Sequence, residues 1–246
     1  MLLELPSNVA HLWYVHPDAI EDWYLLAAYH SVMSQDEAQQ QARYRFAAGR
    51  KEYLVTRALV RSVLSAYAPV LPKDWQFIRN KHGRPEVSGP PGAPRLRFNL
   101  SNTRGLIVCL VTKDRELGVD VEDIQRPGET VAIADRFFSP LETAELLRQP
   151  MHKQRDRFFD YWTLKEAYIK ARGMGLAIPL DHFSYHLENP QAIRISFAPQ
   201  LPDNPARWQF SLRTLGGRHR IATAVERRPD EAPVEIQMMK CVPFER

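Results

Sequence analysis

The chain has 246 residues, of which 44% are hydrophobic and 25% charged, so it can bury a core without disulfides or structural metals. Its two cysteines are too few for a disulfide framework or a cysteine metal cluster, and its apolar runs are far shorter than the roughly 20 residues that span a membrane. Residues 1–16 contain neither a basic start nor a long apolar stretch, so we expect no signal peptide and a cytoplasmic location.

The net charge of +4 conceals a strong segregation of charge along the chain. Residues 1–42 carry six acids and no Lys or Arg, whereas residues 43–104 carry thirteen Lys or Arg and three acids. A basic block of this size indicates an anionic partner, such as a phosphorylated molecule, a nucleic acid or an acidic protein. A solvated basic surface without a ligand is the alternative interpretation.

The first part of the chain predicts a short strand at 11–15, then helices, then strands. Apolar residues at helical spacing, and a capping box that starts at Ser34, predict the helices. Their expected ranges are 17–33, 34–45 and 51–67. Alternating or apolar runs bounded by glycine and proline predict strands at 75–79, 96–100, 106–112 and 117–121.

The second part repeats this order of helices followed by strands. A capping box at Ser139–Glu142 with proline at the first helical position predicts one helix, and a second is expected at 158–172, ended by Gly173. Further strands are expected at 182–187, 193–197, 208–215, 220–226 and 234–240. The order predicts an α+β protein with an N-terminal half at 1–112 and a C-terminal half at 113–246. The chain has no glycine-rich phosphate loop, which argues against a nucleotide kinase or a dinucleotide enzyme.

Two carboxylates lie on one face of the strand that contains Gly118–Glu122. The alternation places Asp120 and Glu122 on the same side, roughly 7 Å apart at the backbone, so their oxygens can converge on one ion. Oxygen ligands with no His or Cys nearby in sequence favour a hard cation such as magnesium. A polar strand face that shows its acids to water is the structural alternative.

A second group of chemically active residues lies on the helix predicted at 158–172. Glu166 and Lys170 are one turn apart beside apolar neighbours, and a Glu near apolar surface can become a stronger base. A Lys beside it can stabilise phosphate charge or a leaving group. The structural alternative is an ordinary surface ion pair at i,i+4, which contributes only a few tenths of a kcal/mol.

Taken together, Gly118–Glu122 and Trp162–Ala167 followed by Lys170 resemble the paired signature of the Sfp-type 4′-phosphopantetheinyl transferases. Further pieces of the family pattern follow in the expected order. They are Arg43–Phe46, Arg57–Arg61, Gly83–Pro85, Phe98–Ser101, Arg136–Ser139 and Gly173–Leu176. The resemblance extends over residues 40 to 190, approximately.

The resemblance implies a pseudo-twofold pair of similar α+β halves with coenzyme A in the cleft between them. It implies an enzyme that moves 4′-phosphopantetheine from coenzyme A to a serine of an acidic apo acyl or peptidyl carrier protein and releases adenosine 3′,5′-bisphosphate. Asp120, Glu122 and Glu166 would hold Mg²⁺, and Glu166 would be a ligand, the base for the carrier serine, or both. Lys170 would stabilise the charge that develops on the bridging phosphate oxygen, so the catalytic residues would be Glu166, Lys170 and Asp120.

The same resemblance implies a role for the basic segment, which would bind the adenosine end of coenzyme A and its 3′-phosphate. The residues implied to bind coenzyme A are Arg57, Arg84, Ser101, Asn102 and Lys170. The family commonly has a histidine where this chain has Asn102. Because Asn cannot become cationic, we expect weaker or less pH-sensitive coenzyme A binding, with activity retained.

Two other classes of protein share parts of this pattern. A metal-dependent phosphohydrolase or nuclease also combines three acids with a basic flank. A non-catalytic nucleic-acid-binding protein could use the basic block, although the interleaved aromatic residues of such domains are missing from it. The family resemblance favours a monomeric transferase that binds neither nucleic acid nor membrane.

Overall fold

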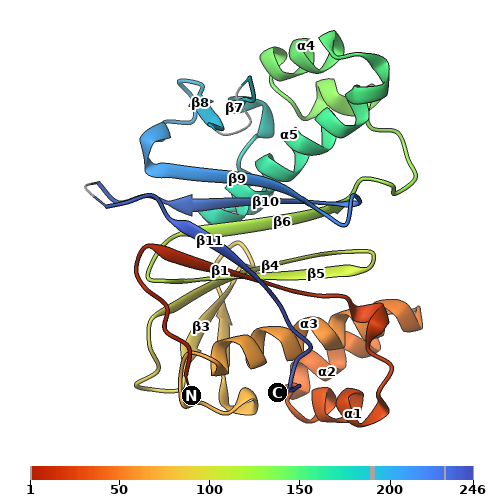
Figure 1. The fold of residues 1–246 in the computed structure, drawn as a ribbon, viewed down its shortest axis with the longest axis vertical. Coiled ribbons are helices and arrows are strands. Elements are labelled where there is room, and N and C mark those ends of the chain that lie inside the picture. Colours follow the sequence, from red (N-terminus) through yellow and green to blue (C-terminus); the bar gives the residue numbers. More distant parts are fainter. Residues whose placement is uncertain (1, 189–191, 230, 246) are drawn as a thin grey trace. The chain divides into compact units, whose positions relative to one another are not determined.

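The computed structural model describes residues 2–188, 192–229 and 231–245, and it combines helices with strands (Figure 1). The α+β class predicted from the sequence is confirmed. The chain divides into a first unit of Met1–Asp114 and Glu235–Arg246 and a second unit of Arg115–Val234. No helix in the described ranges is long and apolar enough to cross a membrane.

The end of the chain belongs to the first unit, whereas the sequence assigned all of residues 113–246 to the second half. Strand β11 (Glu235–Lys240) pairs in parallel with β1 (Val9–Val15). Parallel partners need a long connection, and here most of the chain separates the two strands. No turn motif in the sequence indicates a pairing between strands so far apart, so the sequence did not predict it.

The first unit contains a four-stranded sheet in the order β11-β1-β5-β4. The last two strands of this order, β4 (Leu96–Thr103) and β5 (Leu106–Lys113), form an antiparallel hairpin. A separate hairpin joins β2 (Gln76–Arg79) to β3 (Pro85–Gly89). The sequence did not predict β3, because proline and glycine are depleted in strands.

In the residues that the structure describes, three α-helices complete the first unit, together with 3₁₀ turns at Pro17–Ala19 and Pro72–Asp74. They are α1 (Trp23–Ser31), α2 (Gln35–Ala42) and α3 (Ala47–Ser65). The predicted capping box of α2 is present, with reciprocal hydrogen bonds between Ser34 and Glu37. The apolar face of α3 contributes Leu54, Ala58 and Leu59 to a core that also contains Ile107 and Val111 of β5.

The second unit contains a three-stranded antiparallel sheet in the order β6-β10-β9 and a small β7-β8 hairpin. The strands are β6 (Leu117–Asp123), β7 (Phe183–His186), β8 (Arg194–Phe197), β9 (Trp208–Leu215) and β10 (His219–Glu226). The helices are α4 (Pro140–Arg148) and α5 (Met151–Arg172), with 3₁₀ turns at Val131–Arg136, Gly175–Ala177, Leu180–His182 and Pro205–Arg207.

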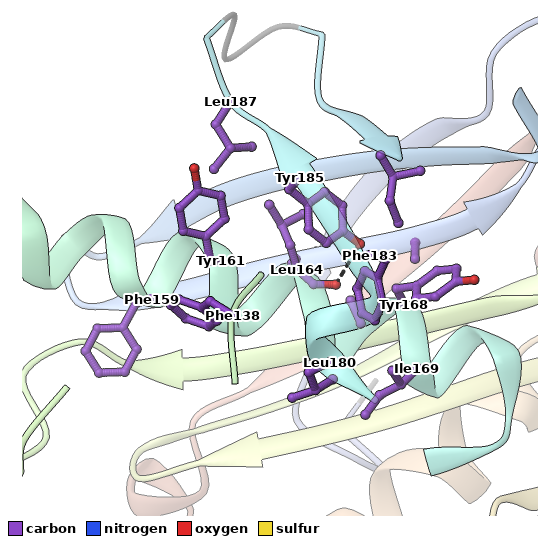
Figure 2. Packing of buried hydrophobic residues seen from close by; sticks show 14 of the residues in the cluster. Phe138, Phe159, Tyr161, Leu164, Tyr168, Ile169, Leu180, Phe183, Tyr185 and Leu187 are labelled. Carbon is purple, nitrogen blue, oxygen red and sulfur yellow. Dashed lines mark hydrogen bonds between the residues drawn. The ribbon is translucent and has the colours of Figure 1, made fainter. Parts of the chain in front are cut away.

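Helix α5 lies on one face of this sheet and carries much of the core of the second unit. Figure 2 shows Leu164 and Tyr168 of α5 near Phe183 and Tyr185 of β7, where the Tyr185 hydroxyl donates a hydrogen bond to the Leu164 carbonyl at 2.9 Å. The helix ends at Gly173, which adopts φ 64, a left-handed conformation that glycine tolerates. The core therefore fixes the rotation of α5 about its axis, and with it the directions of the side chains that face β6.

Candidate active site

The face of β6 that carries the acids is covered by α5. A Cβ at Gly118 would lie 2.0 Å from the carbonyl oxygen of Ala167 and 2.4 Å from the backbone nitrogen of Ala171, so only glycine fits there. Residues two apart share a strand face, so Asp120 and Glu122 point to the same side as Gly118. Asp120 is only 5% exposed. The acids thus lie under a helix, which removes the interpretation of a solvated strand face.

Asp120 and Lys170 connect β6 to the last turn of α5. The Lys170 Nζ donates to Asp120 Oδ1 at 2.6 Å, and the two side chains are 26% and 7% exposed. The sequence offered an ion pair between Lys170 and Glu166 as the structural alternative, and it did not predict the ion pair of Lys170 with an acid fifty residues away. The lysine is therefore directed at the acidic strand.

Glu122 is held by two donors. The Trp162 Nε1 donates to Glu122 Oε1 at 2.9 Å, and Arg126 Nε lies 3.3 Å from Glu122 Oε2. Burial, and next the nearby charge of Asp120, raise the pKa of Glu122 to about 7, while Arg126 and the bond from Trp162 oppose the shift. Glu122 is thus a carboxylate whose ionised form needs further positive charge.

The pKa of Glu166 is raised by the same two causes as that of Glu122. Burial raises its pKa, the charge of Asp120 raises it further, and the charge of Lys170 opposes both effects. Asp120 thus adds to the effect of burial on both glutamates, and the causes that oppose it are the charges of Lys170 and Arg126 and the hydrogen bond from Trp162. Such a cluster of oxygen donors has the chemistry that a hard divalent cation requires.

The three acids do not converge on one point as the side chains stand. In the described part of the chain, no three His, Cys, Asp or Glu side chains are grouped closely enough to hold a metal ion. Lys170 occupies one oxygen of Asp120, and Trp162 with Arg126 hold the two oxygens of Glu122. The predicted metal ligands therefore lie on β6 and α5, which pack against each other, and the charge of Asp120 acts on both glutamates. Their joint role as metal ligands stays a prediction.

Of the residues predicted to bind coenzyme A, Lys170 lies in the second unit, and Arg57, Arg84, Ser101 and Asn102 lie in the first, where the two arginines line different cavities. Arg57 of α3 lines a cavity of about 690 Å³, whereas Arg84, which precedes β3, lines a separate one of about 70 Å³. Ser101 is buried on β4 and its neighbour Asn102 is exposed. The Asn102 Nδ2 donates a hydrogen bond to Glu52, so this amide lies against a carboxylate.

Sequence reasoning missed the role of Lys165 within the motif Trp162–Ala167. Its Nζ is fully buried and lies 2.7 Å from Glu142 Oε2, and it also donates to the carbonyls of Leu180 at 2.6 Å and Phe183 at 2.7 Å. Burial lowers the pKa of Lys165, against the opposing charge of Glu142. The capping box that ends at Glu142 was visible in the sequence, but its second use as a buried counter-ion was not.

Comparison with known proteins gives a consistent result over most of the chain. Residues 116–224 match the family described as 4′-phosphopantetheinyl transferase superfamily, and residues 19–115 match 4′-phosphopantetheinyl transferase, N-terminal. The 4′-phosphopantetheinyl transferase HetI of Nostoc sp. is 33% identical over 198 residues, which are 80% of this chain and 82% of the relative. The 4′-phosphopantetheinyl transferase Sfp of Bacillus subtilis is 33% identical over 151 residues, 61% of this chain and 63% of the relative.

Proposed function

The chain belongs to the 4′-phosphopantetheinyl transferase superfamily, and we propose that it transfers the 4′-phosphopantetheine group of coenzyme A to a serine of an apo acyl or peptidyl carrier protein. The serine oxygen forms a bond to the phosphorus that carries the pantetheine, and the bond from that phosphorus to the bridging diphosphate oxygen breaks. Adenosine 3′,5′-bisphosphate leaves. The family membership favours this reaction over a phosphohydrolase, a nuclease or a nucleic-acid-binding protein.

The observation that carries the proposal is the pair of acids Asp120 and Glu122 on β6, with Lys170 of α5 directed at Asp120. Phosphoryl transfer depends mainly on positioning and on stabilising the charge of the phosphate oxygens. Lys170 supplies a positive charge at a fixed place, 2.6 Å from Asp120 Oδ1. Glu166, whose pKa is raised by burial, lies one turn earlier on α5 and would accept the proton of the carrier serine.

The carboxylate set fits the magnesium that the family resemblance implies. Asp120, Glu122 and Glu166 offer only oxygen donors, and burial, followed by the charge of Asp120, raises the pKa of both glutamates. These three residues would hold Mg²⁺, which would neutralise diphosphate charge when bound. Glu166 would serve as ligand, as base, or as both.

The basic residues of the first unit would bind the nucleotide end of the same coenzyme A molecule. Arg57 and Arg84 would contact its phosphates, and Ser101 and Asn102 its polar groups. The hydrogen bond from Asn102 to Glu52 directs the amide toward a carboxylate, which supports a weaker phosphate contact at this position than a histidine would make.

Intact mass spectrometry of several apo carrier proteins tests the function. After incubation with the protein, coenzyme A and magnesium, we expect at least one carrier to gain the mass of one phosphopantetheine group. Adenosine 3′,5′-bisphosphate should be released only when that carrier is present. Its release without a carrier would show hydrolysis instead, and an unmodified panel of acyl and peptidyl carriers would reject the transferase proposal.

Replacing Arg57 with Ala should weaken coenzyme A binding about ten- to a hundredfold, because it removes a charge-assisted hydrogen bond of roughly 1.5–3 kcal/mol. Isothermal titration calorimetry with coenzyme A measures the change. Arg95→Ala is the matched control, since it removes the same charge from an exposed position of the same unit. Equal affinities of the two variants would remove Arg57 from the site.

A further inference from the structure

Residues 124–130 form a loop that directly follows β6, the strand of Asp120 and Glu122. The 124–130 loop leads to the 3₁₀ turn at Val131–Arg136, and its residues belong to neither a helix nor a strand. Backbone groups outside helices and strands take their hydrogen bonds from side chains, turns or water. The side chains that bond to this loop therefore decide how the chain leaves the strand of the predicted metal ligands.

The start of the 124–130 loop is bonded to the sheet of the second unit. Arg218 Nε and Nη2 donate to the two carboxylate oxygens of Asp123 at 2.9 and 2.7 Å. Gln125 N donates to Asp123 Oδ1 at 3.0 Å, and Ile124 N donates to the Arg218 carbonyl at 3.0 Å. The paired bonds of a guanidinium group to a carboxylate add geometric specificity, so they fix the first two residues of the loop.

The rest of the loop is bonded to α5 by the side chain of Arg155. Its guanidinium group donates to three loop carbonyls, from Nε to Ile124 at 3.0 Å, from Nη1 to Gly128 at 3.1 Å, and from Nη2 to Arg126. The Thr130 hydroxyl oxygen also lies 3.5 Å from Arg155 Nη1. Because the guanidinium donors form a rigid planar fork, this one side chain fixes three alternate peptide groups relative to α5.

The side chain of Arg126 returns from the loop to Glu122. Arg126 Nε lies 3.3 Å from Glu122 Oε2, although the arginine side chain is 45% exposed. The guanidinium carbons of Arg126 and Arg155 lie 5.3 and 5.2 Å from the ring centre of Phe159, a buried residue of α5 (Figure 2). An ion pair of an exposed arginine contributes little free energy and does not hold a long side chain by itself. The placement of Arg126 therefore depends on its backbone, whose N donates to the Asp123 carbonyl at 3.0 Å and whose carbonyl accepts from Arg155.

We propose that Arg155 is a positioning residue of the transfer reaction: it fixes the 124–130 loop so that Arg126 holds the Glu122 carboxylate in place as a ligand for Mg²⁺. This inference rests on the proposed function. Groups that hold a ligating carboxylate orient it, and their loss typically lowers metal affinity about ten- to a hundredfold. Glu122 is held by Trp162 at Oε1 and by Arg126 at Oε2, and the second of these contacts depends on Arg155.

Calorimetric titration of Mg²⁺ into the protein saturated with coenzyme A tests the inference without a carrier. Arg155→Met removes the donors and keeps an unbranched stem beside Phe159, and it should weaken Mg²⁺ binding about tenfold. Arg126→Ala should weaken it by a similar factor. Because Arg155 acts through Arg126, the double variant should bind Mg²⁺ within about twofold of Arg126→Ala alone.

Rates of carrier modification distinguish positioning from a general loss of structure. In Arg155→Met, the Mg²⁺ concentration for half-maximal rate should rise about tenfold, while the rate at saturating Mg²⁺ stays within about twofold of the wild-type rate. The KM for coenzyme A should not change. Disruption of α5 would instead lower the rate at every Mg²⁺ concentration, and that result would contradict the positioning role.

Arg157→Met is the matched control, because Arg157 is an arginine of the same helix whose guanidinium carbon lies 5.9 Å from the ring centre of Tyr161. Its ion pairs are with Glu145 and Asp160, so its loss should leave Mg²⁺ binding unchanged. If Arg155→Met or Arg126→Ala binds Mg²⁺ like the wild-type protein, or if their effects multiply in the double variant, the positioning role is wrong. Those results leave the transferase proposal intact when the wild-type protein modifies a carrier, whereas failure to modify any carrier rejects the function itself.

Discussion

Asp120→Ala and Glu166→Ala should each lower turnover at least about a hundredfold while the melting temperature barely moves. Both acids belong to a cluster in which negative charges repel one another, so removing one relieves repulsion and costs little stability. Lys170, the partner that Asp120→Ala would release, is 26% exposed and can turn toward water. Loss of a ligand would instead misplace the cation and the diphosphate together, which turnover detects and stability does not.

Initial rates of carrier modification at saturating coenzyme A, together with thermal melts, measure this prediction. Asp156→Ala is the matched control, because it removes an exposed acid from the same helix as Glu166. A surface acid contributes at most about 1 kcal/mol, so this control should keep nearly normal turnover. If Asp120→Ala or Glu166→Ala retains more than about a third of normal transfer, the catalytic assignment of that residue fails.

The same cluster predicts how the variants combine. Residues that act as one unit are not additive, so the Asp120→Ala, Glu166→Ala double variant should be little slower than either single variant. Glu122→Ala keeps two of the three acids, and higher magnesium should partly restore its turnover. Independent effects that multiply in the double variant would contradict a shared site.

The chemistry of the site could be predicted from local sequence, but its geometry could not. The alternation in Gly118–Glu122 placed Asp120 and Glu122 on one strand face, and the structure agrees. The contact of Lys170 with Asp120 joins residues fifty positions apart, and no periodicity specifies it. It depends on the close approach of α5 to Gly118, which requires the absence of a side chain at that glycine.

The predicted starts of two helices were wrong, because their first turns lack the apolar spacing that indicates a helix. The sequence predicted a helix from residue 158, whereas α5 begins at Met151, directly after Pro150. Met151 is the single apolar residue in 151–157, so apolar spacing could not identify the first turns of the helix. Similarly, α3 begins at Ala47, before the predicted start at residue 51. The sequence did not indicate this first turn, because it contains small residues and Gly49 and no large apolar side chain.

The segregation of charge along the sequence is partly cancelled by folding. The acidic segment 1–42 contains Glu37, which holds Arg61 at 2.8 Å and lies 3.8 Å from Arg57 of the basic segment. Two arginines of the basic block, Arg57 and Arg61, therefore lie beside an acid of the first segment and are not part of a solvated basic surface. Arg57 and Arg79 of the same block line the cavity of about 690 Å³.

The largest loss of stability should come from the buried pair of Glu142 and Lys165. Both side chains are 0% exposed and their charged atoms lie 2.7 Å apart. Glu142→Ala would leave the Lys165 ammonium buried with the carbonyls of Leu180 and Phe183 as its acceptors and without the carboxylate beside it. Breaking one partner of a buried ion pair costs about 3–5 kcal/mol, which is a large part of the roughly 5–15 kcal/mol that stabilises a domain. Urea unfolding followed by circular dichroism should show this loss.

A double variant distinguishes the cost of leaving the Lys165 charge buried without its partner from the cost of lost packing at Glu142. Glu142→Gln with Lys165→Met removes both charges and keeps similar volumes, so it should recover much of the stability that Glu142→Ala loses. Lys165→Met alone should cost less than Glu142→Ala, because the Glu142 carboxylate still accepts hydrogen bonds from Tyr185 N at 2.8 Å and Ser139 N at 3.0 Å. If the double variant is less stable than Glu142→Ala, the buried charge is not what destabilises the single variant. Since Lys165 precedes Glu166 on α5, recovery of stability with restored turnover would show that the pair serves the active site by holding the helix in place.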